Sequence, residues 1–250
     1  MMATEKKVAI ILPNFNSFHY ISSTIKSVIN QTYKNWHLII VDDASEERTK
    51  KILINLKKNK KIKIIFLKKN CGAGYCRNLA LKNSKSFYVA FIDSDDTWEK
   101  NKLKNQINFM ERKKISFSYT FYKTVYKKKI KKIKVKKKYN FNSFIRDTSI
   151  ATSTMLIERK IIKNIKFLNT KICEDYFFKC QLLKKINYAY CLKKYLTNYT
   201  IRKNSLQSNK LKNIYWVWKI NKNFNKLKLL TNFLSIFFIS LNSLKKYGLR

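Results

Sequence analysis

The first half of the chain alternates short apolar runs with segments that look helical. Apolar runs at residues 8–12, 36–41, 62–67 and 87–92 are typical of buried strands, and Pro13 ends the first of them. Residues 17–31 place apolar side chains at helical spacing, and residues 46–58, 75–84 and 99–113 also indicate helices. Short buried strands between amphipathic helices predict an α/β fold, with a mostly parallel central sheet flanked by helices on both faces.

The second half is less regular. Residues 115–126, 152–157 and about 195–201 indicate strands, and residues 174–185 indicate a helix. From about residue 209 the chain looks helical to its end, with an apolar stripe of Leu227, Leu230, Leu234, Phe237, Leu241 and Leu244. Such a stripe is typical of a face that docks on the rest of the fold, and a membrane-surface helix is the alternative.

The chain is strongly basic. It has 250 residues with 55 Lys and Arg against 14 Asp and Glu, which gives a net charge of +41. Residues 127–138 alone hold nine lysines in twelve positions. We expect that run to form a solvated hairpin or loop, with contact to an anionic membrane surface as the alternative. A surface this basic attracts polyanions, namely anionic lipid, nucleic acid or phosphorylated substrates.

Cysteine usage and the lack of long apolar runs predict a cellular compartment. The five cysteines are odd in number and have no C-x-x-C spacing, and the first residues lead into a strand without a signal-peptide pattern. No apolar run approaches the roughly 20 residues that span a bilayer. We therefore expect a cytoplasmic protein. The net charge, the lysine-rich run and the C-terminal stripe further indicate peripheral work on the cytoplasmic face of a membrane, and the alternative is a general lysine bias with the tail docked on the domain.

The acids are grouped, which is informative in so basic a chain. Asp42-Asp43 and Asp93-Ser94-Asp95-Asp96 follow predicted parallel strands, at the sheet edge where α/β proteins bind ligands. Asp93 and Asp95 form a D-x-D pattern whose carboxylates suit a hard divalent ion, Mg²⁺ or Mn²⁺. The alternative is an N-terminal cap for the helix predicted from residue 99.

Two further groups indicate binding and catalysis. Gly72 and Gly74 share a loop before a helix that carries Arg77, an arrangement that favours anions, although a tight turn explains the glycines equally well. Glu174-Asp175 open a predicted helix. One of these carboxylates fits a general base, and stabilisation of the helix N-terminus is the alternative.

Together these segments resemble family 2 glycosyltransferases of the GT-A fold. The resemblance rests on VAIILPNFN at 8–16, SVINQTYKNWHLIIVDDASEERT at 27–49, NCGAGYCRNLAL at 70–81 and FYVAFIDSDDTWEKNKL at 87–103. The second half is similar to the subgroup that builds teichuronic acid and related surface polysaccharides. That similarity lies in FSYTFY at 117–122, IATSTMLIERKII at 150–162, CEDYFFKCQLLKK at 173–185 and YTIRKNSLQSNKLKNIYWVW at 199–218.

The resemblance implies a metal-dependent inverting transfer from a nucleotide-sugar, most often UDP-linked, to a glycan or lipid-linked acceptor. Asp175 matches the catalytic base, and Asp95, with Asp93, matches the Mn²⁺ or Mg²⁺ site. The residues that the resemblance places around the nucleotide-sugar are Pro13, Asn14, Asn16, Asp42, Asp43, Gly74, Arg77, Asp93, Asp95, Asp96, Glu174, Arg202 and Ser205. Cys76, Thr200 and Gln207 depart from the usual pattern, and since Thr200 replaces an arginine, we expect Arg202 to take over a phosphate contact.

The predicted organisation is a glycosyltransferase domain at 1–208 with a helical extension at 209–250. The domain divides into a nucleotide-binding half at about 1–98 and an acceptor-binding half at about 99–208. The alternatives are an α/β nucleotidyltransferase, which lacks its expected glycine-rich triphosphate loop here, an inactive scaffold, and a basic nucleic-acid-binding protein. We expect no nucleic-acid partner, because no recognised binding motif is present and the acids gather at strand ends. The sequence predicts neither the donor sugar, the acceptor nor the oligomeric state.

Overall fold

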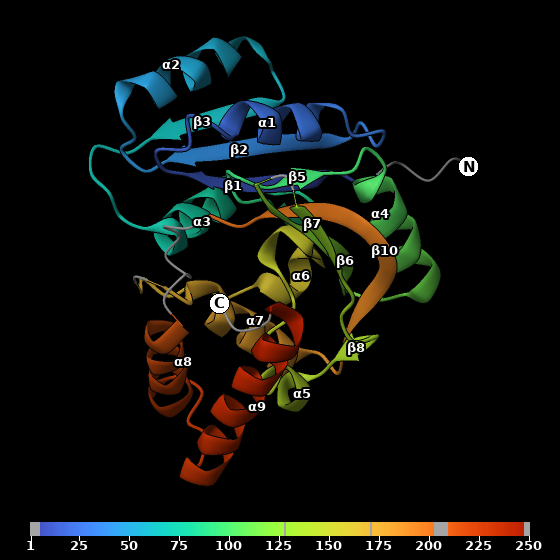
Figure 1. Ribbon diagram of the computed structural model, residues 1–250. Helices are drawn as coiled ribbons and strands as arrows, with labels where there is room; N and C mark the ends of the chain where they lie inside the picture. Colours follow the sequence, from blue (N-terminus) through green and yellow to red (C-terminus); the bar gives the residue numbers. More distant parts are fainter. Residues whose placement is uncertain (1–5, 128, 171, 203–209, 248–250) are drawn as a thin grey trace.

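A computed structural model describes residues 6–127, 129–170, 172–202 and 210–247 (Figure 1). Among these residues the strands form one sheet with the order β3-β2-β1-β4-β9-β6-β10-β5, while β7 pairs with β6 and β8 with β10. The sheet crosses both halves that the sequence predicts, so the two halves share one backbone hydrogen-bonded unit. The domain boundaries themselves stay a prediction.

The first half is the parallel part of the sheet. Its strands are β1 (Val8–Asn14), β2 (Trp36–Asp42), β3 (Ile62–Phe66) and β4 (Tyr88–Phe91). Its helices are α1 (Ile21–Ile29), α2 (Glu47–Asn55) with a 3₁₀ turn at Leu56–Lys58, and α3 (Ala73–Lys82). β1 lies parallel between β2 and β4, as the apolar runs predict.

Burial on both faces explains why these strands are apolar throughout. Ile10 and Leu12 of β1 pack on one side in a core with residues of α1, whereas Ala9 and Ile11 pack on the other side in a core with residues of α3. In Figure 1, α1 and α2 lie on one side of the parallel strands and α3 on the other. Alternate side chains of a strand point to opposite faces, so helices on both faces require apolar residues at every position.

The second half is mixed rather than parallel. Its strands are β5 (Thr97–Trp98), β6 (Phe117–Tyr126), β7 (Lys129–Ile133), β8 (Lys138–Tyr139), β9 (Leu156–Glu158) and β10 (Ala189–Thr200). Its helices are α4 (Lys102–Lys113), α5 (Phe141–Phe144), α6 (Arg159–Ile162) and α7 (Glu174–Lys185). β6 and β10 run parallel, while β9 is antiparallel to both β4 and β6.

Three predicted elements differ from the structure. The strand predicted at 152–157 begins as a 3₁₀ turn at Thr152–Thr154, because Thr154 N–H donates to the Ala151 carbonyl, and only then becomes β9. β10 starts at Ala189, earlier than predicted, because its first residues pair with β6 and β8. The helix predicted from residue 209 is two helices, α8 (Lys210–Asn223) and α9 (Leu229–Tyr247), since Lys226 adopts a positive φ between them.

Part of the lysine-rich run, Lys129–Ile133, forms the strand β7, in agreement with the predicted hairpin. β7 pairs antiparallel with β6, and its lysines are exposed. Within the described residues, no helix combines the length and the apolarity that a membrane crossing needs.

Candidate active site

The ends of β1 and β2 hold a polar cluster at the carboxyl edge of the parallel strands. Asn14 Nδ2 donates to Asp42 Oδ1 (2.6 Å) and to Ser45 Oγ (3.3 Å), and Ser45 N donates to Asp42 Oδ2 (3.1 Å). Asn14 and Asp42 are buried, and Pro13, beside them in β1, is buried too. Asn16 is exposed, and its backbone N–H also donates to Ser45 Oγ (2.9 Å). The cluster therefore fixes the loop after β1 against the loop after β2.

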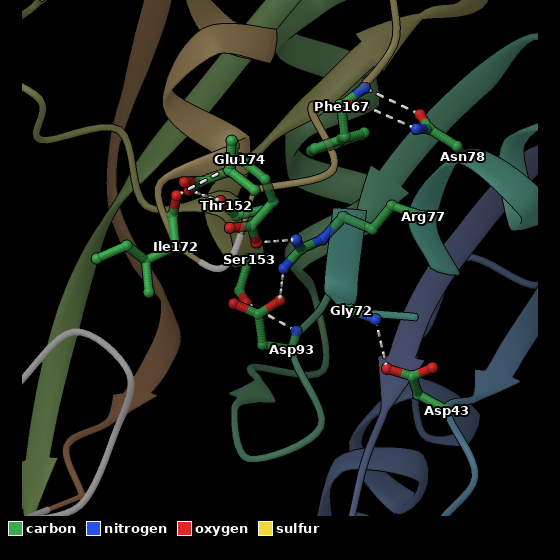
Figure 2. Close-up of polar contacts among 12 residues, drawn as sticks. Asp43, Gly72, Arg77, Asn78, Asp93, Thr152, Ser153, Phe167, Ile172 and Glu174 are labelled. Atoms are coloured by element: carbon green, nitrogen blue, oxygen red, sulfur yellow. Dashed lines mark hydrogen bonds and ion pairs between the residues drawn. The ribbon is translucent and has the colours of Figure 1, made fainter. Parts of the chain in front are cut away.

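Asp43 holds the glycine loop that precedes α3. Its Oδ1 accepts from Cys71 N (2.6 Å) and its Oδ2 accepts from Gly72 N (2.8 Å), as Figure 2 shows for Gly72. Gly72 has a φ of +89°, a conformation that glycine adopts without strain. Both oxygens of Asp43 are thus used in positioning this loop.

Gly74 permits a close approach of α3 to the segment before α7. A Cβ at this position would lie 2.2 Å from the Leu168 carbonyl oxygen and 3.3 Å from the Glu174 side chain. Asn78, one turn further along α3, clamps the same segment through two 2.9 Å hydrogen bonds with the backbone of Phe167. Gly74 therefore faces protein in this structure, and its proposed contact with the nucleotide-sugar stays a prediction.

Arg77 bridges the two acidic groups of the site. Its Nη2 lies 2.7 Å from Asp93 Oδ1 and its Nη1 lies 2.6 Å from Glu174 Oε1, and the side chain is only 5% exposed (Figure 2). Burial lowers the pKa of Arg77, but Asp93, Glu174 and Asp175 raise it more, so the guanidinium stays charged. The arginine joins the loop after β4 to the first turn of α7.

The loop after β4 holds the D-x-D residues. Asp93 N–H donates to Ser153 Oγ (3.0 Å), and Asp95 Oδ2 lies 2.7 Å from Nε of Arg202, a side chain that is 39% exposed. Burial and the charge of Asp93 raise the pKa of Asp95 although Arg202 opposes the shift. Asp96 Oδ1 accepts from the backbone N–H of Thr200 (2.9 Å). Because the donor is a backbone group, this contact does not depend on whether threonine or arginine stands at position 200.

The chemistry of these carboxylates fits a divalent ion. The described residues contain no group of three or more His, Cys, Asp and Glu side chains placed to hold one. However, Mg²⁺ and similar ions are commonly held by one or two carboxylates together with substrate phosphates. Burial and neighbouring negative charge raise the pKa values of Asp95 and Asp96, and a cation beside them would relieve that repulsion.

Asp175 lies in the first turn of α7 in a different environment. Its Oδ2 accepts from Thr152 Oγ1 (2.6 Å) and from Lys179 Nζ (2.6 Å), and the Lys179 side chain is only 5% exposed. Burial raises the pKa of Asp175, but the charges of Lys179 and Arg77 and the two hydrogen bonds lower it further, to well below its ordinary value. Glu174, its neighbour, has a raised pKa because burial outweighs the effect of Arg77.

The structure brings some of the predicted residues into direct contact. Asp93, Arg77 and Glu174 are in direct contact, and Asp95 is linked to Arg202. The predicted residue Ser205 lies outside the described residues.

Sequence reasoning missed Thr152, Ser153 and Lys179. Lys179 could have been found, since it lies four residues after Asp175 on a predicted helix. The 3₁₀ turn that places Thr152 beside Asp175 and Ser153 beside Asp93 has no recognisable pattern in the local sequence.

Comparisons with known proteins were made by sequence and by structure. The model of Glycosyl transferase family 2 matches residues 9–177. The putative teichuronic acid biosynthesis glycosyltransferase TuaG of Bacillus subtilis is 34% identical over 224 residues, which cover 88% of this chain and 89% of that protein. The Escherichia coli UDP-Glc:alpha-D-GlcNAc-diphosphoundecaprenol beta-1,3-glucosyltransferase WfgD is 32% identical, covering 85% of this chain and 84% of the relative.

A solved structure has a similar fold. Residues 1–349 of Staphylococcus aureus TarS, crystallised with UDP-GlcNAc, superpose with a TM-score of 0.74 at 21% identity. The match covers 96% of this chain and 73% of that one.

Proposed function

The chain belongs to glycosyl transferase family 2, and from that premise we propose that it moves a sugar from a UDP-linked donor to a lipid-linked glycan acceptor. The family and its GT-A fold make the protein a glycosyltransferase. The proposal adds the donor, the acceptor, inversion at the sugar and a role in cell-surface polysaccharide biosynthesis. One observation carries the placement of the transfer site: Arg77 joins Asp93 of the D-x-D loop to Glu174, the residue beside Asp175.

The donor is proposed from the relatives and the arrangement of the sheet edge. WfgD is named for UDP-Glc, and TarS was crystallised with UDP-GlcNAc. In this chain Asn14, Asp42 and the Asp43-bound glycine loop lie at the carboxyl ends of parallel strands, where α/β folds bind nucleotides. We assign the nucleotide to this edge, with Pro13, Asn16 and Gly74 around it, and the diphosphate to the side of Asp95, Asp96 and Arg202.

Asp95, assisted by Asp93, would hold Mn²⁺ or Mg²⁺. When bound, the ion would neutralise negative charge that gathers on the nucleoside diphosphate as the sugar bond breaks. Arg202 now neutralises Asp95 and is partly exposed, so it can turn to the diphosphate when another cation takes its place. Ser205, which follows it closely in the sequence, belongs to the same proposed segment.

Asp175 would act as the general base. Its lowered pKa keeps it ionised at neutral pH, and its Oδ2 is occupied by Thr152 and Lys179. In the described residues no hydrogen bond to Oδ1 is found, so Oδ1 is the atom that would accept the proton of the acceptor hydroxyl. The oxygen of that hydroxyl would attack the sugar opposite the diphosphate and invert the anomeric centre. No covalent intermediate is needed.

The acceptor is proposed from the relatives alone. TuaG is named for teichuronic acid biosynthesis, and WfgD for an acceptor linked to diphosphoundecaprenol. We propose that this chain likewise elongates a lipid-linked glycan at the cytoplasmic face of a membrane, as part of the cell envelope pathway.

A nucleotide panel tests the donor. The melting temperature is measured with UDP, GDP, dTDP and CMP, each with and without Mn²⁺. A ligand at 100 times its dissociation constant adds about 2.7 kcal/mol of stability, which such a scan detects easily. We expect the largest shift with UDP and Mn²⁺. A larger shift with GDP, or a UDP shift that Mn²⁺ does not change, contradicts the proposed donor or the proposed metal.

A further inference from the structure

Helix α9 contacts the protein through several polar side chains and through Ile236 and Ile239, while most of its large apolar side chains are exposed. Asn232 and Ser235 are buried although the helix lies on the surface. Asn232 Nδ2 donates to the Trp218 carbonyl of α8 (3.2 Å), and Ser235 Oγ donates to the Ile145 carbonyl. Further along, Asn242 Nδ2 donates to the Arg146 carbonyl (3.0 Å) and Lys246 pairs with Asp147. These polar contacts hold the helix together with Ile236 and Ile239, which pack against the core, and Phe233, whose ring centroid lies 4.7 Å from that of Trp218.

The outward side of α9 carries large apolar side chains. Leu230 is 72% exposed and Phe237 is 58% exposed. They belong to a stripe with spacings of one, three and four residues, formed by Leu230, Phe233, Leu234, Phe237, Leu241 and Leu244. We call these six residues the α9 stripe. An ordinary surface helix buries such a stripe against the fold, whereas here the stripe is exposed.

The charge around the stripe has a single sign. No aspartate or glutamate occurs after Asp175 in the chain. Lys226 and Lys228 precede α9, Lys245 lies in its last turn, and all three are exposed. Lys219 and Lys222 of the neighbouring helix α8 are exposed as well. The exposed charges that α8, α9 and their connection place around the stripe are therefore lysines, and Asp147, which pairs with Lys246, is buried.

We propose that the α9 stripe docks on the surface of an anionic phospholipid bilayer, with its lysines at the headgroups. Helices with one apolar side and a lysine-rich border bind at such interfaces without crossing them. A second copy of the chain is disfavoured as the occupant, because it would bring two lysine-rich borders of the same sign together. This inference rests on the proposed function and deepens it, because it assigns the face that meets the membrane where a lipid-linked acceptor resides.

A buried polar network connects this surface with the candidate active site. Tyr176, the residue after Asp175, donates its hydroxyl to Asn221 Oδ1 of α8 (2.8 Å). Asn221 Nδ2 in turn donates to Ser235 Oγ of α9 (3.0 Å). In Figure 1, α8 and α9 lie at the end of the molecule opposite α2, with α7 between them and the sheet. The membrane-facing helices are thus fixed to the helix that carries the proposed base.

Vesicle sedimentation with the full chain tests the inference. Vesicles of phosphatidylcholine with phosphatidylglycerol are compared with vesicles of phosphatidylcholine alone, at low and at high salt. We expect the wild type to sediment with the anionic vesicles and to be released by salt. The double variant Leu230→Gln/Phe237→Gln should lose about tenfold in vesicle affinity, because the buried apolar area is the main term for such a helix.

The matched control is Ile29→Gln/Ile54→Gln, which changes two exposed apolar residues of α1 and α2. Its vesicle affinity should equal that of the wild type. Lys228→Gln/Lys245→Gln should bind more weakly and depend less on salt. The UDP-induced rise in melting temperature, measured on every variant, reports the proposed donor site separately from vesicle binding.

Three outcomes overturn the inference. One is wild-type protein that stays in the supernatant with anionic vesicles at low salt. Another is a Leu230→Gln/Phe237→Gln variant that binds vesicles as well as the wild type does. The third is a dimer, seen by light scattering, that this variant dissociates while no form of the protein binds vesicles.

Discussion

The D-x-D loop and the first turn of α7 both place carboxylates in the site, but they neutralise them in different ways. Asp95 is paired with Arg202, which is partly exposed and comes from a distant segment, and the pKa of Asp95 remains raised by burial and by Asp93. Asp175 is paired with Lys179, which is buried on the same helix, and its pKa is lowered. A carboxylate with an exchangeable counter-ion suits a transient cation, whereas one with a fixed counter-ion suits a base that stays ionised.

Removing Arg77 should have the largest effect on stability, because Arg77 pairs with a carboxylate in each of the two regions. Arg77→Met removes a buried guanidinium and leaves the partly buried Asp93 and Glu174 without their shared cation. The loss of one partner from a buried ion pair costs about 3–5 kcal/mol of unfolding free energy. Urea denaturation measures this loss of unfolding free energy. The control is Arg48→Met, whose pair with Glu46 is exposed and should change stability by about 1 kcal/mol or less. Equal losses in the two variants would contradict the bridging role.

The Asp175→Asn change separates chemistry from donor binding. We expect sugar transfer to fall by about 10²-fold or more, the usual scale for a lost general base. UDP binding should remain near that of the wild type, because the proposed nucleotide edge lies across the site on β1 and β2. Single-turnover transfer and UDP titration measure the two quantities. If both fall together, Asp175 belongs to the donor side and the contrast between the two regions is lost.

The Asp95→Asn change should affect metal-dependent donor binding, the quantity that Asp175→Asn leaves unchanged. It removes the charge that would hold Mn²⁺, so the additional thermal stabilisation that Mn²⁺ gives to UDP binding should disappear. That difference is worth up to about 2.7 kcal/mol at a hundredfold ligand excess. The fold should persist, because burial and Asp93 already disfavour the charged form of Asp95. Unchanged turnover of the variant with Mn²⁺ would show that Asp95 is no metal ligand.

The smallest effect on turnover at neutral pH is expected from Lys179→Met, and it should appear as a shift in pH dependence. Lys179 lowers the pKa of Asp175, so its removal raises that pKa and the acid limb of the kcat profile moves to higher pH. Each unit of pKa shift costs about tenfold in rate at a pH below the new pKa. Lys185→Met on the same helix is the control, because Lys185 is exposed and contacts a backbone carbonyl instead. A purely structural role for Lys179 would lower kcat equally at every pH.

The sequence predicted the parallel half of the fold well, because local patterns determine it. Strands buried on both faces must be apolar throughout, so β1 to β4 could be located within a few residues. The predicted helix at 174–185 coincides with α7. The 3₁₀ turn at Thr152–Thr154 escaped prediction because contacts with distant residues such as Asp93 and Asp175 stabilise it, rather than its own side-chain pattern.

The stripe of the C-terminal segment was recognised, but its orientation was not. Periodicity shows that Leu230, Leu234 and Leu241 share one side of a helix, and the usual expectation is that this side faces the protein. In the structure that side is exposed, because Asn232 and Ser235, together with Ile236 and Ile239, make the contacts with the body. Hydrogen bonds to backbone carbonyls leave no periodic signal that a sequence pattern could reveal.

The bridge made by Arg77 also constrains the order in which the protein can mature on the ribosome. Its partner Asp93 follows 16 residues later, whereas Glu174 follows 97 residues later. Closing the longer loop costs roughly 1.6 kcal/mol more in chain entropy than closing the shorter one. A nascent chain that has emerged only to the end of the D-x-D loop contains Asp93 but not Glu174, so only one of the two ion pairs of Arg77 can form. The candidate active site is therefore completed only after synthesis has passed α7, well after β1 and β2 have been translated.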